Sequence, residues 1–287
     1  MDTIVSVQVI SERAAEETQR ALGWFGQVER VCSRFDPASE VFRLSTHVGI
    51  PVDVSALLFE AVRFAVQVAE LSGGLFDPTI GSAQARRGFD RNYVTGQHVA
   101  APDTADAVSY RDVVLDEQLR TIMLREPLLI DLGAVAKGMA IDLAAQELAG
   151  FDSFSIDAGG DLYVKGRNED GEPWRVGIEH PRVPGLIATL ALTEGAVCTS
   201  GDYERRRPGV EGEHHLLDPR TGQSPQQAIS CTIVAPTAMA ADALSTAAFI
   251  AGPSEGLRLL DEQGVDGMIV SPAFGMSMTP HFERWLA

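Results

Sequence analysis

Residues 130–142, with the sequence IDLGAVAKGMAID, restrict the fold of this chain more than any other stretch. An apolar run ends at Asp131, small residues form a turn, and residues 133–138 open a helix that carries Lys137 at its start. A strand that delivers an acid to a helix N-terminus suits an anionic ligand, because the free amides and the helix dipole face it. From this segment alone, Asp131 could equally be an N-cap and Lys137 a solvated charge.

The rest of the chain predicts an α+β fold with mainly antiparallel sheets and packed helices. Residues 3–10 alternate apolar and polar side chains, as a half-buried strand does, and Ser55 can begin an apolar helix that ends before Gly73. Short strands in antiparallel order are expected over residues 153–202, with a glycine turn at 159–160. Further elements are predicted as three strands over 113–131, a strand over 214–218, a helix from about Asp242, a second helix after Pro253, and two C-terminal strands.

Length and charge limit the possible functions. At 287 residues and 45% hydrophobic, the chain can bury a large core as one domain or as two lobes that share an interface. Its net charge of −17 repels nucleic acid and anionic membranes, and we expect neither as a partner. A phosphorylated ligand would therefore need local positive charge from a few basic side chains, a helix N-terminus or a bound divalent cation.

Targeting signals and cysteine spacing add two expectations. The first residues lack a basic region followed by an apolar stretch, and a run of about 18 apolar residues is absent, so a cytoplasmic location is expected. Cys32, Cys198 and Cys231 are odd in number and lack CxxC spacing. They predict reduced thiols packed as small hydrophobic side chains, and neither a disulfide framework nor a zinc site.

Two turns carry candidate ligand-binding groups. In the segment GGLFDPTIGS, two glycines and an Asp-Pro turn could present Leu75, Phe76 and Asp77 together, although a turn without a ligand explains the same residues. The segment TSGDYERRR places hydroxyls and a carboxylate beside the arginines 205–207, the densest positive cluster in the chain. Such a cluster can meet phosphate, but runs of this kind are more often solvated surfaces.

His215 and the residues near Asp242 are the candidates for proton transfer and metal binding. An imidazole can take a proton from an attacking hydroxyl, and HxxxH spacing, which would favour zinc, is absent. Asp242, Ser245 and Thr246 lie three and four residues apart on one helix face and all offer oxygen, which suits Mg²⁺ better than zinc or copper. The simpler interpretation is a structural histidine and a helix start with back-bonding hydroxyls.

Read in order, these segments resemble the motifs of the FAD:protein FMN transferase family, also called ApbE. The matching segments are MDT at 1–3, SRF at 33–35, GLFDPT at 74–79, DLGAVAKG at 131–138, GGD at 159–161, TSGD at 199–202, HLLDPRTG at 215–222 and DALST at 242–246. The resemblance covers nearly the full chain, and it implies one T-fold-related domain over residues 1–287, with two lobes and FAD in the cleft between them.

The resemblance also implies the site residues and the reaction. FAD, as substrate, would contact Met1, Phe35, Leu75, Phe76, Asp77, Asp131, Lys137 and Leu216. Mg²⁺ would be held by the main-chain carbonyl of Ala134 and the side chains of Asp242, Ser245 and Thr246. The family reaction is attack by a Thr or Ser hydroxyl of an acceptor protein on the FMN phosphorus, with release of AMP. Lys137 would add positive charge at the diphosphate, and His215 is our candidate for the base.

The sequence departs from the family pattern at three positions, and two other functions would use the same segments. Asp2 stands where glycine is usual, Asp157 where asparagine is common, and Ser245 where an acid is often found, which would remove one charge from the metal site. A Mg²⁺-dependent FAD pyrophosphatase would use the same residues with water as nucleophile. A non-catalytic FAD-binding protein would need neither the metal ligands nor the histidine.

Overall fold

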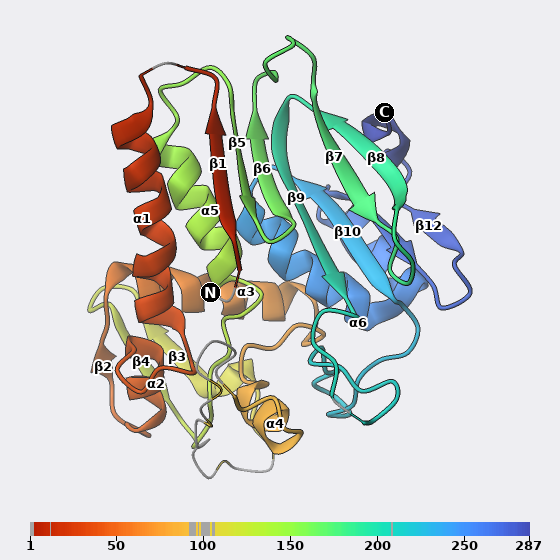
Figure 1. The fold of residues 1–287 in the computed structure, drawn as a ribbon. Coiled ribbons are helices and arrows are strands. Elements are labelled where there is room, and N and C mark those ends of the chain that lie inside the picture. The colour runs from red at the N-terminus through yellow and green to blue at the C-terminus, as the bar shows by residue number, and fades with distance from the viewer. Residues whose placement is uncertain are drawn as a thin grey trace.

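An antiparallel sheet forms the centre of the computed structural model, which describes residues 3–11, 13–91, 96, 98, 104, 107–207 and 209–287. Within these residues the sheet has seven strands, in the order β1-β5-β6-β9-β10-β11-β12 (Figure 1). The strands are β1 (Val5–Val9), β5 (Phe154–Ala158), β6 (Asp161–Lys165), β9 (Glu194–Gly201), β10 (Ser230–Ala235), β11 (Asp266–Val270) and β12 (Met276–Met278). Chain-distant segments thus become neighbours, because β1 pairs with β5 and β6 pairs with β9.

Three helices cover one face of this sheet. They are α1 (Ala15–Cys32), α5 (Ala136–Glu147) and α6 (Ala238–Glu262). α5 packs against both α1 and α6, and α6 lies along β9, β10 and β11 (Figure 1). α6 bends at Gly252, whose φ of 77° is not helical, and Pro253 starts its second half. Small side chains that are completely buried, including Ala241, Ala247 and Ala248, let α6 approach its neighbours closely.

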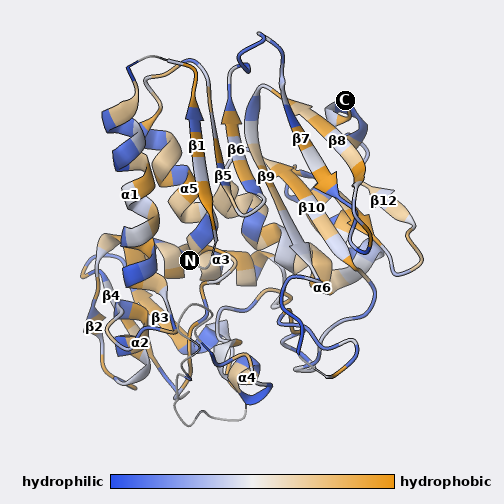
Figure 2. Cartoon of the chain, in the orientation of Figure 1, coloured by the Kyte–Doolittle hydropathy of each residue, from blue (hydrophilic) through white to orange (hydrophobic). Residues whose placement is uncertain are grey.

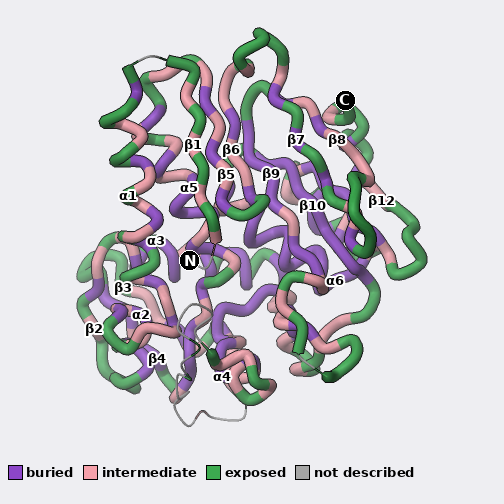
Figure 3. Tube along the Cα trace, in the orientation of Figure 1, coloured by how far each residue is buried: buried purple, intermediate pink, exposed green. Residues whose placement is uncertain are grey.

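The opposite face of the sheet carries a two-stranded hairpin and a second apolar cluster. The hairpin consists of β7 (Trp174–Glu179) and β8 (Leu186–Leu192), and lies in front of β9 and β10 in Figure 1. Val176 and Ile178 of β7 pack with Val197 of β9 and Met268 of β11. The centre of the sheet therefore has apolar side chains on both faces, and Figure 3 shows β10 buried along its length. At the edge of the sheet, β1 instead alternates between hydrophobic and hydrophilic residues (Figure 2).

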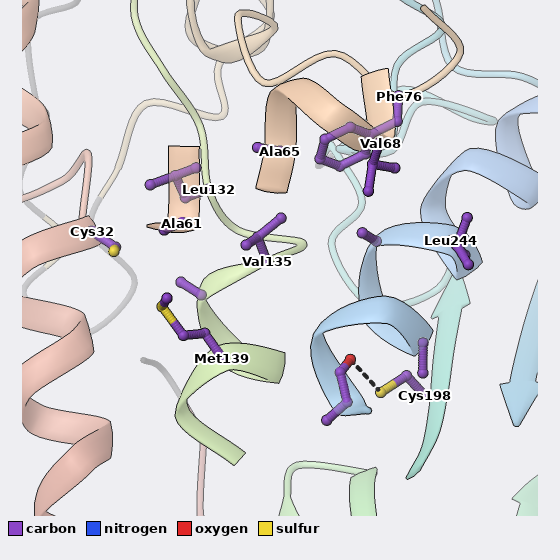
Figure 4. Packing of buried hydrophobic residues seen from close by; sticks show 14 of the residues in the cluster. Cys32, Ala61, Ala65, Val68, Phe76, Leu132, Val135, Met139, Cys198 and Leu244 are labelled. Carbon is purple, nitrogen blue, oxygen red and sulfur yellow. Dashed lines mark hydrogen bonds between the residues drawn. The ribbon is translucent and has the colours of Figure 1, made fainter. Parts of the chain in front are cut away.

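A smaller unit lies below the helical layer. It contains the three-stranded sheet β2-β4-β3 and three helices. The bounds are α2 (Glu40–Ser45), β2 (Val52–Asp53), α3 (Ala56–Leu71), α4 (Gly81–Arg86), β3 (Val113–Asp116) and β4 (Thr121–Leu124), with 3₁₀ turns η1 (Tyr110–Asp112) here and η2 (Phe282–Trp285) at the C-terminus. The Ser55 hydroxyl accepts the Leu58 N–H and so begins α3, as predicted. Figure 4 shows Ala61, Ala65 and Val68 of α3 facing Leu132, Val135 and the start of α5.

The predicted α+β class with antiparallel sheets and packed helices is confirmed, and two predicted strands are wrong. Residues 128–130 form only a single bridge between Leu129 and Ile80, because the Leu129 N–H is taken by the Ser82 hydroxyl. Residues 214–218 form isolated bridges, because the main chain of His214 binds the Ser224 side chain. Among the described residues, no helix combines the length and apolar character needed to span a membrane.

The three cysteines are free and buried, as their spacing predicted. Cys198 of β9 lies under the N-terminus of α6, with its Sγ 3.6 Å from the Ala238 carbonyl oxygen (Figure 4). Burial raises the pKa of the Cys32 thiol to about 12 and also raises that of the other two, so all three are protonated at neutral pH. They act as packing groups.

Candidate active site

A cavity of about 1090 Å³ contains most of the site residues predicted from the sequence. Phe35, Phe76, Asp77, Asp131, Ala134, Lys137, His215, Leu216, Asp242 and Thr246 all line it. Leu75 and Ser245 are not among its lining residues. Met1 and Asp2 lie outside the described residues. The wall is assembled from both the central sheet and the smaller unit, since it runs from Arg34 to Ile250 along the chain.

The N-terminal ends of α5 and α6 meet at one wall of this cavity. At Gly138, a Cβ would lie 2.5 Å from the Ala238 carbonyl oxygen and from the Met239 Cα, so only glycine allows this approach. The Gly138 N–H donates to Asp242 Oδ2 across the junction, with an N···O distance of 3.3 Å. The contact therefore brings Lys137 of α5 beside Asp242 of α6, and both line the cavity although they are 105 positions apart in the chain.

Asp142, one turn further along α5, also holds the two helices together at this junction. Its carboxylate accepts the Ala238 N–H at 2.7 Å and the Met239 N–H at 3.0 Å, so it satisfies two free amides at the start of α6. A negative charge at this position also complements the helix dipole. A role for Asp142 was not predicted, because its only signal in the sequence is its place one helical turn after Gly138.

We expect Asp142→Asn to weaken the pH dependence of stability between about pH 4 and pH 6. Burial raises the pKa of Asp142 from 3.8 to about 6. In that window the folded state therefore holds more protons than the unfolded state, so this group's contribution to the unfolding free energy falls as pH rises and stays low above pH 6. Urea unfolding at several pH values measures the slope, which should change by up to about 1.4 kcal/mol per pH unit.

The exposed residue Asp152 supplies the control for this experiment, because Asp152→Asn removes a carboxylate from the surface. The two variants should differ in slope, and only Asp142→Asn should depart from the wild type. Equal slopes for the wild type and Asp142→Asn would contradict the expected proton uptake.

A buried ion pair lies beside this junction. Lys137 Nζ pairs with Asp161 Oδ2, and the Asp161 side chain is only 3% exposed. The other oxygen of Asp161 accepts the Thr199 N–H at 3.1 Å. Although burial opposes the charged form, Asp161 and Asp242 raise the pKa of Lys137 above its ordinary value, so the ammonium stays protonated. Asp161 stands in the GGD motif, but its pairing with Lys137 was not predicted.

Asp242 completes a cluster of two carboxylates around one ammonium. Burial raises its pKa, and the neighbouring charge of Asp161 acts in the same direction, whereas Lys137 opposes the shift. The charge of Arg205, which also lines the cavity, favours the ionised forms of Asp242 and Asp131. A cluster with this composition leaves room for further positive charge, because two acids face a single lysine at short range.

The hydroxyl groups near Asp242 form a directed chain of hydrogen bonds. Ser245 is completely buried, and its hydroxyl donates to the Asp242 carbonyl oxygen at 2.8 Å. Having used its only proton, Ser245 accepts from Ser200 Oγ at 2.7 Å, and Ser200 in turn accepts from Thr246 Oγ1 at 3.1 Å. The lone pairs of Thr246 consequently stay available at the cavity. Ser245, in contrast, is turned into the protein and supports Ser200.

Asp131, which also lines the cavity, is held by a buried arginine. Arg34 Nε donates to Asp131 Oδ2 at 2.6 Å, and the Gly133 N–H donates to Oδ1 at 2.6 Å. Although burial raises it, the pKa of Asp131 is lowered overall by Arg34 and this amide. The Arg34 guanidinium also lies 4.0 Å from the centre of the Phe35 ring. Arg34 was quoted in a motif, yet its role as the partner of Asp131 was not predicted.

Asp77 stabilises its own turn. One carboxylate oxygen accepts both the N–H and the hydroxyl of Thr79, and the other accepts the Tyr110 N–H at 3.0 Å. Burial raises the pKa of Asp77 against these hydrogen bonds. The carbonyl of the next residue, Pro78, accepts the Asp131 N–H at 2.7 Å. Asp77 therefore shapes the cavity wall on which Phe76 lies.

His215 is half-buried in the cavity wall and is neutral at pH 7. Burial and the charge of Arg205 lower its pKa to about 3. Its Nδ1 is buried and has no hydrogen-bond partner among the described residues, and its main-chain carbonyl accepts from Gln84 Nε2 at 3.0 Å. The neighbouring His214 is instead tied to the Pro225 carbonyl and packs edge-on against Phe249. Of the two histidines, His215 is the one at the cavity.

The three adjacent arginines differ in their surroundings. All three line the cavity, but Arg206 bonds to Asp202 and Arg207 to Glu213. Asp202 also receives a bidentate contact from Arg182. Much of the positive charge predicted for this segment is therefore balanced by acids. The charge of Arg205 acts to lower the pKa values of His215, Asp131 and Asp242.

Comparison with known proteins gives consistent matches over most of the chain. The model of the ApbE family matches residues 1–269. The FAD:protein FMN transferase of Treponema pallidum is 33% identical over 299 residues, covering 94% of this chain and 82% of that protein. That of Haemophilus influenzae is 28% identical over 276 residues, covering 91% and 79%.

Solved structures agree in fold. The ApbE protein of Thermotoga maritima superposes with a TM-score of 0.87 at 29% identity and covers 99% of both chains. The flavin transferase ApbE of Vibrio cholerae has a TM-score of 0.85 at 24% identity, covering 100% of this chain and 96% of that one, which supports the architecture alone. By the match over residues 1–269 and the identity to its relatives, this chain belongs to the ApbE family.

Proposed function

We propose that this chain is an FAD:protein FMN transferase, which moves the FMN moiety of FAD to a Thr or Ser hydroxyl of an acceptor protein and releases AMP. Family membership and the names of the relatives support this activity. The observation that carries the proposal is the meeting of Lys137, Asp242 and Thr246 in one large cavity with a neutral histidine. A diphosphate needs positive charge and an aligned nucleophile, and these groups can supply both.

The residues of this chain have distinct proposed tasks. Phe35 and Phe76 offer apolar surface to the flavin ring, and Asp131, Lys137 and Leu216 contact the remainder of FAD. Lys137 and Arg205 balance the charge of the diphosphate oxygens inside a protein of net charge −17. Leu75, which does not line the cavity, would contact FAD only through its main chain next to Phe76.

The donor set at the helix junction fits Mg²⁺. Among the described residues, no three His, Cys, Asp or Glu side chains gather as a metal-binding group, which argues against a zinc site of side chains alone. Asp242, Thr246 and the Ala134 carbonyl are hard oxygen donors, and Mg²⁺ takes its remaining ligands from water and phosphate. When bound, the ion would neutralise diphosphate oxygens. Ser245 would support this set through Ser200, since its hydroxyl is committed elsewhere.

His215 is the proposed base for the acceptor hydroxyl. The hydroxyl oxygen forms a bond to the FMN phosphorus, the bond from that phosphorus to the AMP oxygen breaks, and the proton moves to a ring nitrogen of His215. The imidazole is neutral, as a base must be, and His215 lines the cavity. The nearby positive charge that lowers its pKa would be offset by an anionic diphosphate, so FAD binding should raise the basicity of His215.

We expect His215→Gln to slow FMN transfer by about 10² to 10⁴-fold, the usual contribution of a positioned base. Glutamine keeps most of the side-chain volume but cannot accept the proton. The Kd for FAD should stay within about twofold of the wild type. The matched control is His281→Gln at an exposed position of the C-terminal turn. A full transfer rate in His215→Gln would rule out this role.

Incubation with FAD, Mg²⁺ and candidate acceptors tests the activity itself. A fluorescent acceptor band in a denaturing gel, with AMP in the supernatant, is the expected result. Free FMN and AMP without a labelled protein would instead identify a pyrophosphatase that uses water. Intact FAD with saturable binding would identify a flavin-binding protein without this chemistry, and the proposal would be wrong.

The domain assignment and the location remain predictions. We propose that residues 1–287 act as one domain, because the cavity takes its wall from Arg34 in the first part of the chain and from Ile250 in the last. The net charge of −17 supports the proposal that neither nucleic acid nor an anionic membrane is a partner. The cytoplasmic location stays a prediction.

A further inference from the structure

The hairpin β7–β8 has one closed and one open edge. The outer edge of β8 is covered by the C-terminal residues, since Leu190 forms a bridge with Leu286, and the Ala287 N–H donates to the Thr189 carbonyl at 2.9 Å. The inner edge of β8 pairs with β7. Within the described residues, no strand pairs with the other edge of β7. Proteins usually cover or blunt such edges, because unpaired main-chain groups readily bind another strand.

The open edge of β7 runs along the candidate active-site cavity. Residues 175–179 all line it, although their side chains alternate between the two faces of the hairpin. Val176 and Ile178 are buried in the apolar cluster, whereas Arg175 and Glu179 are exposed. If only the side chains of one face of the hairpin reached the cavity, every second residue of β7 would line it. An unbroken run of lining residues indicates that the main chain along the edge faces the cavity.

The direction of the main-chain groups can be followed from the turn. The His180 N–H donates to the Gly185 carbonyl, towards β8, and these groups alternate along an antiparallel strand. The N–H groups of Arg175, Gly177 and Glu179 therefore point to the open edge. The register shift does not disturb this alternation, because the extra residue lies in β8, between Leu186 and Ala188.

The end of β7 lies close to the proposed reaction centre. Burial raises the pKa of Glu204, and both Lys137 and Glu179 act on that carboxyl electrostatically. Burial raises the pKa of Tyr203, and the charges of Glu204 and Glu179 act in the same direction. Tyr203 and Glu204 line the same cavity and thus connect the strand edge with the lysine. A segment bound along β7 would therefore end in the same cavity that Lys137 lines.

We propose that the open edge of β7 binds an extended segment of the acceptor protein as an added strand, which delivers its Thr or Ser hydroxyl to the cavity. This inference rests on the proposed transferase function, which requires a protein substrate at this site. Recognition would come from main-chain hydrogen bonds, as in other complexes formed by strand addition. Gly177, at the middle of the edge, presents its N–H and C=O without a side chain that could cover them.

The test compares Gly177→Pro with Gly177→Ala. Both add a Cβ, which at this position meets the flexible end of Leu186, but only proline removes the N–H. Proline is tolerated on an edge strand when its missing N–H faces away from the partner strand. The probe is an array of threonine-centred peptides of the length of β7, with binding measured by fluorescence anisotropy without FAD and labelling measured with FAD and Mg²⁺.

We expect the best-binding peptide to bind Gly177→Pro about fivefold to tenfold more weakly than Gly177→Ala, the effect of one lost main-chain hydrogen bond. The two variants should have equal Kd values for FAD. Methylation of the peptide's own main-chain nitrogens should weaken binding at every second position only, because alternate N–H groups face β7. The Gly177 amide of the wild-type protein should exchange more slowly with solvent when the peptide is bound.

Several results would overturn the proposal. These are equal peptide affinities for the two variants, weakening at consecutive methylated positions, protection of Gly177 by a second copy of the chain at high concentration instead of by peptide, or binding of no array peptide. Failure of the transferase function gives a different pattern, in which peptides bind the β7 edge but FAD stays intact. Peptide binding is measured without catalysis, so the two failures are distinguishable.

Discussion

Asp242→Asn is expected to reduce FMN transfer by about 10³-fold, a loss that corresponds to about 4 kcal/mol of stabilisation from a bound cation. In the absence of Mg²⁺, the same variant should be at least as stable as the wild type. Asp242 and Asp161 are two buried acids near one ammonium, and burial raises the pKa of Asp242, so its charged form is unfavourable in the protein alone. Asparagine removes that charge and keeps an oxygen for the Gly138 N–H.

The measurement is thermal unfolding with and without Mg²⁺, together with calorimetric titration of the ion. Wild-type Tm should rise with Mg²⁺, and the Tm of Asp242→Asn should not, since a ligand stabilises only the state that binds it. Asp261→Asn is the control, because Asp261 is exposed near the end of the same helix α6. An equal Mg²⁺-dependent rise in Tm for wild type and Asp242→Asn would show that the ion is held elsewhere.

Lys137→Met is expected to abolish transfer and also to lower the unfolding free energy by about 3–5 kcal/mol. Methionine keeps an unbranched side chain, one atom shorter than that of lysine, but leaves Asp161, which is 3% exposed, without its counter-ion. The double variant Lys137→Met/Asp161→Asn should regain most of the lost stability, because neither group is then charged and the asparagine oxygen can still accept the Thr199 N–H. Its transfer activity should stay absent.

Urea unfolding of the wild type, Lys137→Met, Asp161→Asn and the double variant measures the interaction between Lys137 and Asp161 directly. A double variant as unstable as Lys137→Met would mean that lost packing, and not an unpaired carboxylate, accounts for the effect. Transfer by the double variant at the wild-type rate would remove Lys137 from the proposed chemistry.

Local signals in the sequence predicted the elements that carry the site, because they act over a few residues. Ser55 begins α3 through a bond to Leu58, three residues later, and such a contact is visible in the sequence. The turn of β5 into β6 at Gly159-Gly160 is equally local, since both glycines have positive φ. The same applies to Lys137 at the start of α5.

Partners that meet through the tertiary fold could not be predicted. Asp161 faces Lys137 only because β6 pairs with β9 and α5 packs on that sheet, and Arg34 reaches Asp131 from a loop 97 residues away. The Ser245 hydroxyl could bind a metal or bond back to its own helix, and composition does not decide between the two. In the structure it donates to the Asp242 carbonyl. The two strands wrongly predicted around Leu129 and His214 have the apolar pattern of a strand but lack a continuous neighbour.

The main-chain contact at Gly138 has a consequence for how substrate enters. Two helices that touch backbone to backbone, and that share hydrogen bonds through Asp142 and Asp242, cannot slide past each other without breaking the junction. The oxygen donors at the N-terminal ends of the two helices are thus already in place when the chain has folded, before FAD binds. Any adjustment to an incoming dinucleotide has to come from the surrounding rim, which should make association rates sensitive to loop substitutions that leave equilibrium unfolding untouched.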